Sequence, residues 1–224
     1  MEQQYVVDEI STSESWRLFR IMAEFVEGVE TLARIQPGVA IFGSARVLPG
    51  SAPYELAYET ARKLAQAGYT IITGGGPGVM EAANKGAHEV GAQSVGLNIN
   101  LPLEQRPNPY VKTLFGFRYF FVRKVMFVKY SQAFIIMPGG FGTLDELFES
   151  ITLIQTHKIK PFPVILVGRN FWTPLLQWME ENLQANGLIS NGDRSIMRVA
   201  DSPEDVLAIV QNNHFSAHTP KGIA

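Results

Sequence analysis

Cysteine is absent from the 224 residues of the chain. That absence excludes disulfide bonds, thiolate nucleophiles, iron–sulfur clusters and cysteine-ligated zinc. The chain also lacks an excess of either charge, since 19 lysines and arginines stand against 21 aspartates and glutamates. A protein that grips nucleic acid through a basic surface is therefore disfavoured, and no nucleic-acid partner is expected.

Long hydrophobic runs are also missing. The longest, such as 134–137 and 164–167, have the length of a strand and fall far short of the ~20 residues that a membrane helix needs. The segment 1–15 is acidic and polar, without the basic and then apolar regions of a signal peptide. The sequence therefore predicts a cytoplasmic protein with no membrane partner. The four histidines lack metal-ligand spacing, so no metal site is expected either.

The residues that are present form an ordinary globular composition, 46% hydrophobic and 18% charged, which excludes disorder as the main state. Short apolar runs alternate along the chain with segments of helical periodicity, and such alternation predicts a parallel sheet covered on both faces. The predicted strands are 39–42, 69–73, 94–99, 113–117, 133–137, 163–167 and 196–199. The predicted helices are 14–33, 54–67, 79–90, 120–131, 144–157, 172–185 and 203–212.

The fold class is therefore α/β, a single Rossmann-like, doubly wound parallel sheet of about seven strands, with an extra N-terminal helix. We expect an N-terminal extension and helix over 1–36, a nucleotide-binding catalytic domain over 37–212, and a C-terminal tail over 213–224. Ligands of such sheets bind outside the carboxyl ends of the strands. The residues that follow the strands are therefore the candidates for function.

Three predicted strands run through glycine into a helix, at 43–46, 73–81 and 137–146. Glycine lets a ligand approach the backbone, and the N-terminus of the following helix attracts phosphate. The alternative is that these glycines only turn the chain between strand and helix. The loops lack the Gly-Lys-Ser/Thr of a Walker A motif, and no frame fits the Gly-x-Gly-x-x-Gly/Ala dinucleotide pattern. A mononucleotide phosphate site is the better prediction.

Two charged residues lie beside these loops. Thr143 and Glu146 have the spacing of a capping box, which would explain Glu146 structurally. A carboxylate beside a phosphate loop can instead stabilise an oxocarbenium-like sugar cation or orient water. Arg123, on the preceding helix, either belongs to a solvated basic patch or completes an anion site with its planar guanidinium.

The stretch PGGFGTLDE at 138–146, with Arg123-Lys124 upstream, resembles the PGGxGTxxE signature of the LOG ("lonely guy") family. These are cytokinin riboside 5′-monophosphate phosphoribohydrolases, many once labelled lysine decarboxylases. The resemblance runs from Val39 to about Val210, and the stretches at 43–46, 73–87, 94–99 and 127–134 look most like a longer bacterial branch.

The resemblance implies a Rossmann-like homodimer or higher homo-oligomer that hydrolyses the N-glycosidic bond of cytokinin riboside 5′-monophosphates or AMP. The products would be free base and ribose 5-phosphate, and no cofactor or metal is required. The family's catalytic residues fall on Arg123 and Glu146. The expected substrate-binding residues are Gly43, Ser44, Gly75, Gly76, Pro77, Gly78, Lys124, Gly139, Gly140, Gly142, Thr143 and Thr152.

Other functions stay open at this point. A non-catalytic nucleotide or molybdenum-cofactor carrier can have the same glycine-rich architecture, although it gains nothing from an acid at Glu146. Binding of single-stranded DNA would need a basic face with stacking aromatics. A pyridoxal-dependent decarboxylase would need a suitable lysine, and Lys124 is the candidate near the loops. The apolar residues Trp16 and Phe19 and the aromatic run 115–121 either self-associate or pack on the chain's own core.

Overall fold

Seven parallel strands form the centre of the fold. The computed structural model describes residues 14–33, 35, 38–100 and 106–212, so the predicted C-terminal tail and the whole segment before the first helix lie outside the described residues. Within them one sheet has the order β4-β3-β2-β1-β5-β6-β7, and every pairing is parallel, which confirms the predicted fold class. The strands are β1 (Gly38–Phe42), β2 (Thr70–Thr73), β3 (Ser94–Ile99), β4 (Thr113–Phe117), β5 (Phe134–Ile136), β6 (Val164–Val167) and β7 (Met197–Ala200).

A helix forms at each of the seven predicted places. They are α1 (Glu14–Leu32), α2 (Ala52–Gln66), α3 (Val79–Glu89), α4 (Phe120–Tyr130), α5 (Phe141–Gln155), α6 (Arg169–Trp178) and α7 (Pro203–Gln211), with short η1 (Met179–Gln184) and η2 (Asp193–Ile196). The segment predicted as one helix over 172–185 begins earlier, after Gly168 in a left-handed conformation, and continues from α6 into the π-helical η1.

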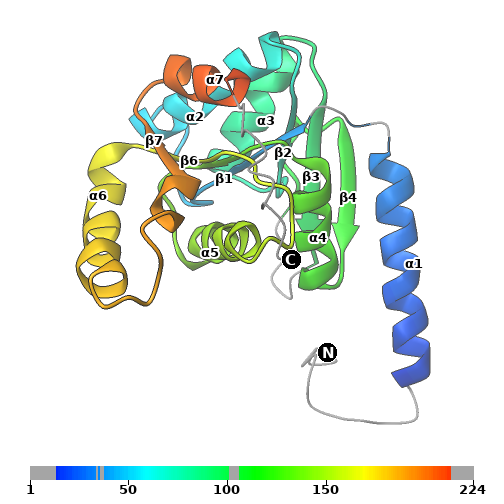
Figure 1. Cartoon of the computed structure of the whole chain (residues 1–224). Helices are drawn as coiled ribbons and strands as arrows, with labels where there is room; N and C mark the ends of the chain where they lie inside the picture. The colour runs from blue at the N-terminus through cyan, green and yellow to red at the C-terminus, as the bar shows by residue number, and fades with distance from the viewer. Residues whose placement is uncertain (1–13, 34, 36–37, 101–105, 213–224) are drawn as a thin grey trace.

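Two cores lie on the two faces of the sheet, and β1 shows how the strands supply both. Val39 and Ile41 pack with α2, α3 and α7, whereas Ala40 and Phe42 pack with α4 and α5. This alternation is the period of two expected of a strand whose faces are both covered. Figure 1 shows α2, α3 and α7 above the sheet and α4 and α5 below it.

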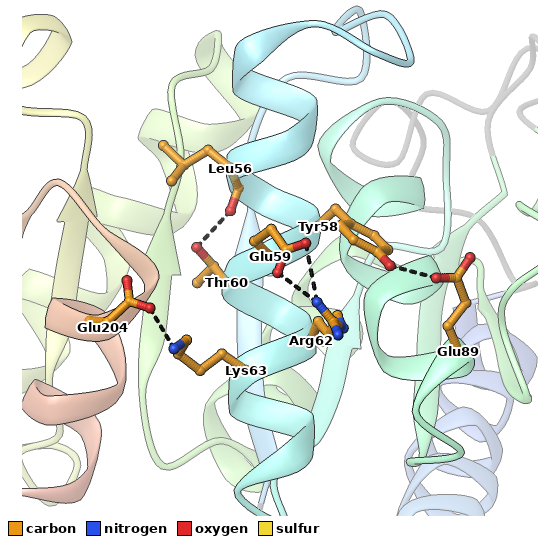
Figure 2. Close-up of polar contacts among 8 residues, drawn as sticks. All are labelled: Leu56, Tyr58, Glu59, Thr60, Arg62, Lys63, Glu89 and Glu204. Carbon is orange, nitrogen blue, oxygen red and sulfur yellow. Dashed lines mark hydrogen bonds and ion pairs between the residues drawn. The ribbon is translucent and has the colours of Figure 1, made fainter.

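Polar side chains on the outer face of α2 link it to the neighbouring helices. The Tyr58 hydroxyl donates to Glu89 on α3, and Lys63 pairs with Glu204 on α7 (Figure 2). Exposed ion pairs of this kind contribute about 0–1 kcal/mol each. The three helices therefore stay on the sheet chiefly through the apolar core beneath them.

Helix α1 stands outside the sheet, next to α4 and β4 (Figure 1). It packs through the side of Glu24, Gly28 and Leu32, which are buried. Trp16 and Phe19 are 71% and 59% exposed, so the alternative in which they pack on the chain's own core is wrong. No helix among the described residues is long and apolar enough to cross a membrane.

Strand β1 lies between β2 and β5, and it pairs with them through Gly38↔Thr70 and Ala40↔Phe134. The chain order along the sheet reverses between β1 and β5. A crevice forms at such a reversal because the connections on its two sides lead to opposite faces. The three glycine segments follow β1, β2 and β5, so all three begin close to this reversal.

Candidate functional site

The loops after β1, β2 and β5 are joined by backbone hydrogen bonds through Ser44. Its N–H donates to the carbonyl of Pro138 at 3.1 Å, and its own carbonyl accepts from the N–H of Val79 at 3.1 Å. The three glycine segments therefore meet at one edge of the sheet. Their meeting creates the walls of a cavity.

That cavity has a volume of about 640 Å³. Its lining is polar at the loops and at Thr143 and Glu146, and it is apolar at residues such as Met80, Ile99, Phe120 and Phe127. The lining residues are Phe42, Gly43, Ser44, Ala45, Arg46, Gly74, Met80, Ile99, Phe120, Arg123, Phe127, Gly140, Phe141, Gly142, Thr143, Leu144 and Glu146. Seven of the predicted site residues are among them, and they are Gly43, Ser44, Arg123, Gly140, Gly142, Thr143 and Glu146.

Arg123 and Glu146 face each other inside the cavity. Nη2 of Arg123 lies 3.7 Å from Oε1 of Glu146, and the two side chains are only 15% and 5% exposed. The ring centroids of Phe120 and Phe127 lie 5.6 and 5.5 Å from the guanidinium carbon. Nε of Arg123 is buried without a hydrogen-bond partner among the described residues. The guanidinium therefore has donor capacity left for a ligand.

Burial has the largest effect on the pKa values of Arg123 and Glu146. It raises the pKa of Glu146 from 4.5 to about 7, although the positive charges of Arg123 and Lys124 oppose the shift. Burial also lowers the pKa of Arg123, against the attraction of Glu146. A guanidinium keeps its proton in proteins. Glu146 is thus an acid that titrates near neutrality beside a permanent positive charge, as catalytic carboxyl groups commonly do.

The capping-box explanation of Glu146 is wrong. Helix α5 begins at Phe141 with Gly140 as its N-cap residue, and no side chain caps it. Thr143 and Glu146 therefore lie inside the helix, and a capping bond of that spacing cannot form. Thr143 instead gives its N–H to the carbonyl of Gly140 at 3.0 Å. The buried carboxyl group needs another explanation.

The glycines of this segment divide into two kinds. A Cβ built at Gly140 or Gly142 meets nothing within 4 Å, so the backbone there borders open space in the cavity. At Gly139 a Cβ would collide with the side chain of Thr143, and at Gly43 it would come within 2.9 Å of Val79 and Met137. Gly140 and Gly142 allow a ligand to approach, whereas Gly139 and Gly43 are needed for packing.

The loop after β2 does not line the cavity with its predicted residues. Gly75, Gly76, Pro77 and Gly78 lie beside it, and Gly74 lines it instead. The N–H of Gly75 donates to Thr73 Oγ1 at 2.9 Å. A Cβ at Gly78, whose φ is 69°, would collide with the carbonyl of Ser44. Positive φ angles and close backbone contacts therefore explain Gly75 and Gly78 without a bound phosphate.

Lys124 and Thr152 line a second pocket along α5, which adjoins the first and shares Phe141 and Leu144 with it. Nζ of Lys124 pairs with Asp145 at 2.9 Å and Glu149 at 3.0 Å, which ties α4 to α5. The hydroxyl of Thr152 donates to the carbonyl of Phe148. Within this one chain neither residue reaches the cavity that holds Glu146.

Several lining residues were not predicted from the sequence. Arg46 lies in the loop after β1, Met80 is the second residue of α3, and Ile99 ends β3. All three lie at or beyond the carboxyl end of a strand, which was a usable signal, because ligand sites of this fold lie at the carboxyl ends of strands. Among the described residues, no cluster of three or more histidine, aspartate or glutamate side chains could hold a metal ion.

Comparison with known proteins adds to this geometry. A family model described as possible lysine decarboxylase matches residues 80–210. The LOG cytokinin riboside 5′-monophosphate phosphoribohydrolase of Oryza sativa is 29% identical over 162 residues, which cover 69% of this chain and 65% of the rice protein. The chain thus spans a little under two thirds of that relative. The Mycobacterium tuberculosis protein of the same activity name is 31% identical over 157 residues, covering 68% of this chain and 82% of that protein.

Solved structures show the same architecture. A structural-genomics target titled TM1055 matches with a TM-score of 0.61 and 25% identity, over 79% of this chain and 99% of the other. A molybdenum cofactor binding protein from Rippkaea orientalis matches with a TM-score of 0.54 and 25% identity, over 78% of this chain and 93% of the other. The fold is therefore shared with a protein that is named for binding molybdenum cofactor, whereas the relatives found by sequence are named as hydrolases.

Proposed function

The chain belongs to the LOG family, whose family model is described as possible lysine decarboxylase, and from that premise we propose that it hydrolyses nucleoside 5′-monophosphates. The bond cleaved is the N-glycosidic bond of AMP or of a cytokinin riboside 5′-monophosphate. The C1′–N bond breaks, the oxygen of water joins C1′, and a proton goes to the base. The products are free base and ribose 5-phosphate.

One observation carries the proposal: a buried carboxyl group with a pKa near 7 lies beside an arginine in a cavity that begins at the N-terminus of a helix. The helix N-terminus attracts a phosphate, and the open backbone at Gly140 and Gly142 lets it approach. The phosphate alone would repel a carboxylate. An acid in this position is therefore useful where positive charge develops on the sugar.

Each group then has a role. The 5′-phosphate binds at Gly140, Gly142 and Thr143, and the free donors of Arg123 bind phosphate or ribose oxygens. The carboxylate of Glu146 stabilises the positive charge at C1′ as the bond breaks, and it orients the attacking water. The base lies against the apolar side chains that line the cavity. A single electrostatic contact of this kind is worth ~10²–10³ in rate.

The experiment is a panel of monophosphates, AMP and N6-isopentenyl-AMP among them, each scored for released base and for ribose 5-phosphate. Adenosine, which lacks the phosphate, is the matched control substrate. We expect base and ribose 5-phosphate in equal amounts from one or more monophosphates, and at least about a hundredfold slower release from adenosine. Equal rates with and without the phosphate would contradict the proposed phosphate site.

The second candidate is a carrier that binds a nucleotide or molybdenum cofactor without turnover. The likeness to the Rippkaea orientalis protein, which is named as a binding protein, favours it. Glu146 disfavours it, because the buried acid would weaken the binding of any phosphate beside it. A protein that binds AMP stably for hours and releases no base would support the carrier.

A lysine decarboxylase, as the family description suggests, would need a lysine that can form a Schiff base with pyridoxal phosphate. Lys124 is committed to Asp145 and Glu149, and both carboxylates favour its charged form. Its amine does not line the cavity. The residues present therefore do not fit that cofactor, and we derive no step through it.

We also propose that the protein is a homodimer or a larger homo-oligomer. The apolar side chains Trp16, Phe19, Met22 and Val26 on α1 are all more than half exposed. Apolar patches of this kind mark interaction surfaces. Light scattering coupled to size exclusion should give a mass above the 24.8 kDa of one chain, and Trp16→Ser with Phe19→Ser should lower it. A monomer at micromolar concentration would contradict this.

A further inference from the structure

Glu24 of α1 is a buried carboxylate that contacts the start of α4. It is 8% exposed. Its Oε2 accepts the N–H of Arg118 at 3.0 Å, and its Oε1 accepts the N–H of Tyr119 at 3.1 Å. The contact joins residues more than ninety positions apart in the chain. Each oxygen of this carboxylate therefore holds one backbone donor.

Helix α4 has no cap of its own. Its N-cap residue is Tyr119, no side chain from the flanking sequence accepts its first N–H groups, and its first turn contains no acidic residue. Anions stabilise a helix N-terminus, and a hydrogen bond to an ionised carboxylate is stronger than one between neutral groups. Glu24 supplies from α1 what the local sequence of α4 lacks.

Two backbone groups of Tyr119 connect Glu24 to Arg123 in the candidate active site. Tyr119, held by Glu24 through its N–H, accepts with its carbonyl the N–H of Arg123 at 3.2 Å. Arg123 is thus one helical turn from the capped peptide. We propose that Glu24 is a positioning residue, which fixes the first turn of α4 so that the Arg123 guanidinium meets Glu146 and the substrate. This inference rests on the proposed function, since it assigns Glu24 to the same reaction.

A second bond between α1 and α4 provides a matched control. At the far end of α4 the hydroxyl of Tyr130 donates to the carbonyl of Val29 on α1 at 3.2 Å. Removing this bond loosens the same pair of helices but leaves the first turn of α4 intact. Tyr130→Phe therefore separates a general loss of α1 packing from the specific loss of the cap.

The test compares Glu24→Gln with Tyr130→Phe, both shown to be folded by circular dichroism. Glutamine keeps the size of the side chain, but its amide NH₂ would oppose one of the two backbone donors. Hydrogen exchange should be about tenfold faster over residues 118–123 in Glu24→Gln and unchanged there in Tyr130→Phe. The kcat for AMP should fall about tenfold in Glu24→Gln, with KM within about threefold, and stay near wild type in Tyr130→Phe.

A pH profile adds a readout that a purely structural role would not move. The charged groups facing Glu146 are Arg123 and Lys124 on α4, and Asp145 and Glu149 on α5. The positive charge of Arg123 lowers the pKa of Glu146. If Arg123 moves away, this pKa rises further, so the acid limb of the profile should shift to higher pH in Glu24→Gln alone. Unchanged exchange at 118–123, or equal kcat in the two variants, would overturn the inference. A wild-type protein that releases no base would refute the proposed function instead, and the exchange comparison, which needs no substrate, would still decide whether Glu24 caps α4.

Discussion

Replacing Glu146 by glutamine should change how the stability of the protein depends on pH. Burial raises the pKa of this carboxyl group from 4.5 to about 7 in the folded protein. The folded state therefore holds the proton more tightly than the unfolded chain does. The contribution of Glu146 to the free energy of unfolding is greatest below about pH 4.5, where both states are protonated. This contribution falls as the pH rises from about 4.5 to about 7.

The magnitude follows from the two pKa values. For a shift from 4.5 to about 7, the linkage relation gives a loss of about 2–3 kcal/mol in the free energy of unfolding between pH 5 and pH 8. Glutamine does not titrate, so the variant lacks this loss. The cost of leaving Arg123 beside a neutral amide is the same at both pH values, because the guanidinium keeps its charge. It therefore cancels from the comparison.

The assay is urea unfolding of the wild type and Glu146→Gln at pH 5 and pH 8, with exposed Glu181→Gln as the control. The stability of Glu146→Gln relative to wild type should rise by about 2–3 kcal/mol from pH 5 to pH 8, and that of the control should stay within about 0.5 kcal/mol. An equal difference at the two pH values would mean that Glu146 titrates like an exposed glutamate. The desolvated site described above would then not exist.

Three further outcomes are expected. The kcat/KM for AMP should rise with pH and level off above about 7, because the ionised form of Glu146 stabilises the sugar cation; initial rates from pH 5.5 to 9 check this, and a flat profile speaks against it. Gly43→Ala should cost about 1–3 kcal/mol in urea unfolding, because its Cβ would crowd Val79 and Met137; no loss would show that the loop adjusts freely. Gly142→Val should leave the free energy of unfolding nearly unchanged but weaken AMP binding at least about tenfold by calorimetry, because its side chain would fill the phosphate side of the cavity. Unchanged affinity would mean that the phosphate binds elsewhere.

The fold was predictable because each strand and helix has its own periodicity. Val39 and Ile41 belong to one core and Ala40 and Phe42 to the other, so the strand reads as a continuous apolar run, as in any doubly covered parallel sheet. The helix predicted over 172–185 was less accurate. The switch from α6 to the π-helical η1 has no signal in the apolar spacing.

The candidate site was predictable only in part, because a glycine can serve a ligand or a neighbour. Gly78 lies against the Ser44 carbonyl and Gly139 against Thr143, and these contacts depend on the tertiary structure. The start of α5 was misjudged for a related reason, since the Thr143–Glu146 spacing fits a capping box that the helix does not use. Glu24 gave no signal at all, because its partners are distant in sequence.

The central claim is that Glu146 acts on the sugar after the phosphate has been bound by other groups. Its most direct test measures AMP binding by calorimetry and base release by Glu146→Gln in the same preparation. The account predicts an affinity close to that of the wild type and base release reduced by at least about a hundredfold. Base release at the wild-type rate, or loss of AMP binding together with turnover, would contradict it.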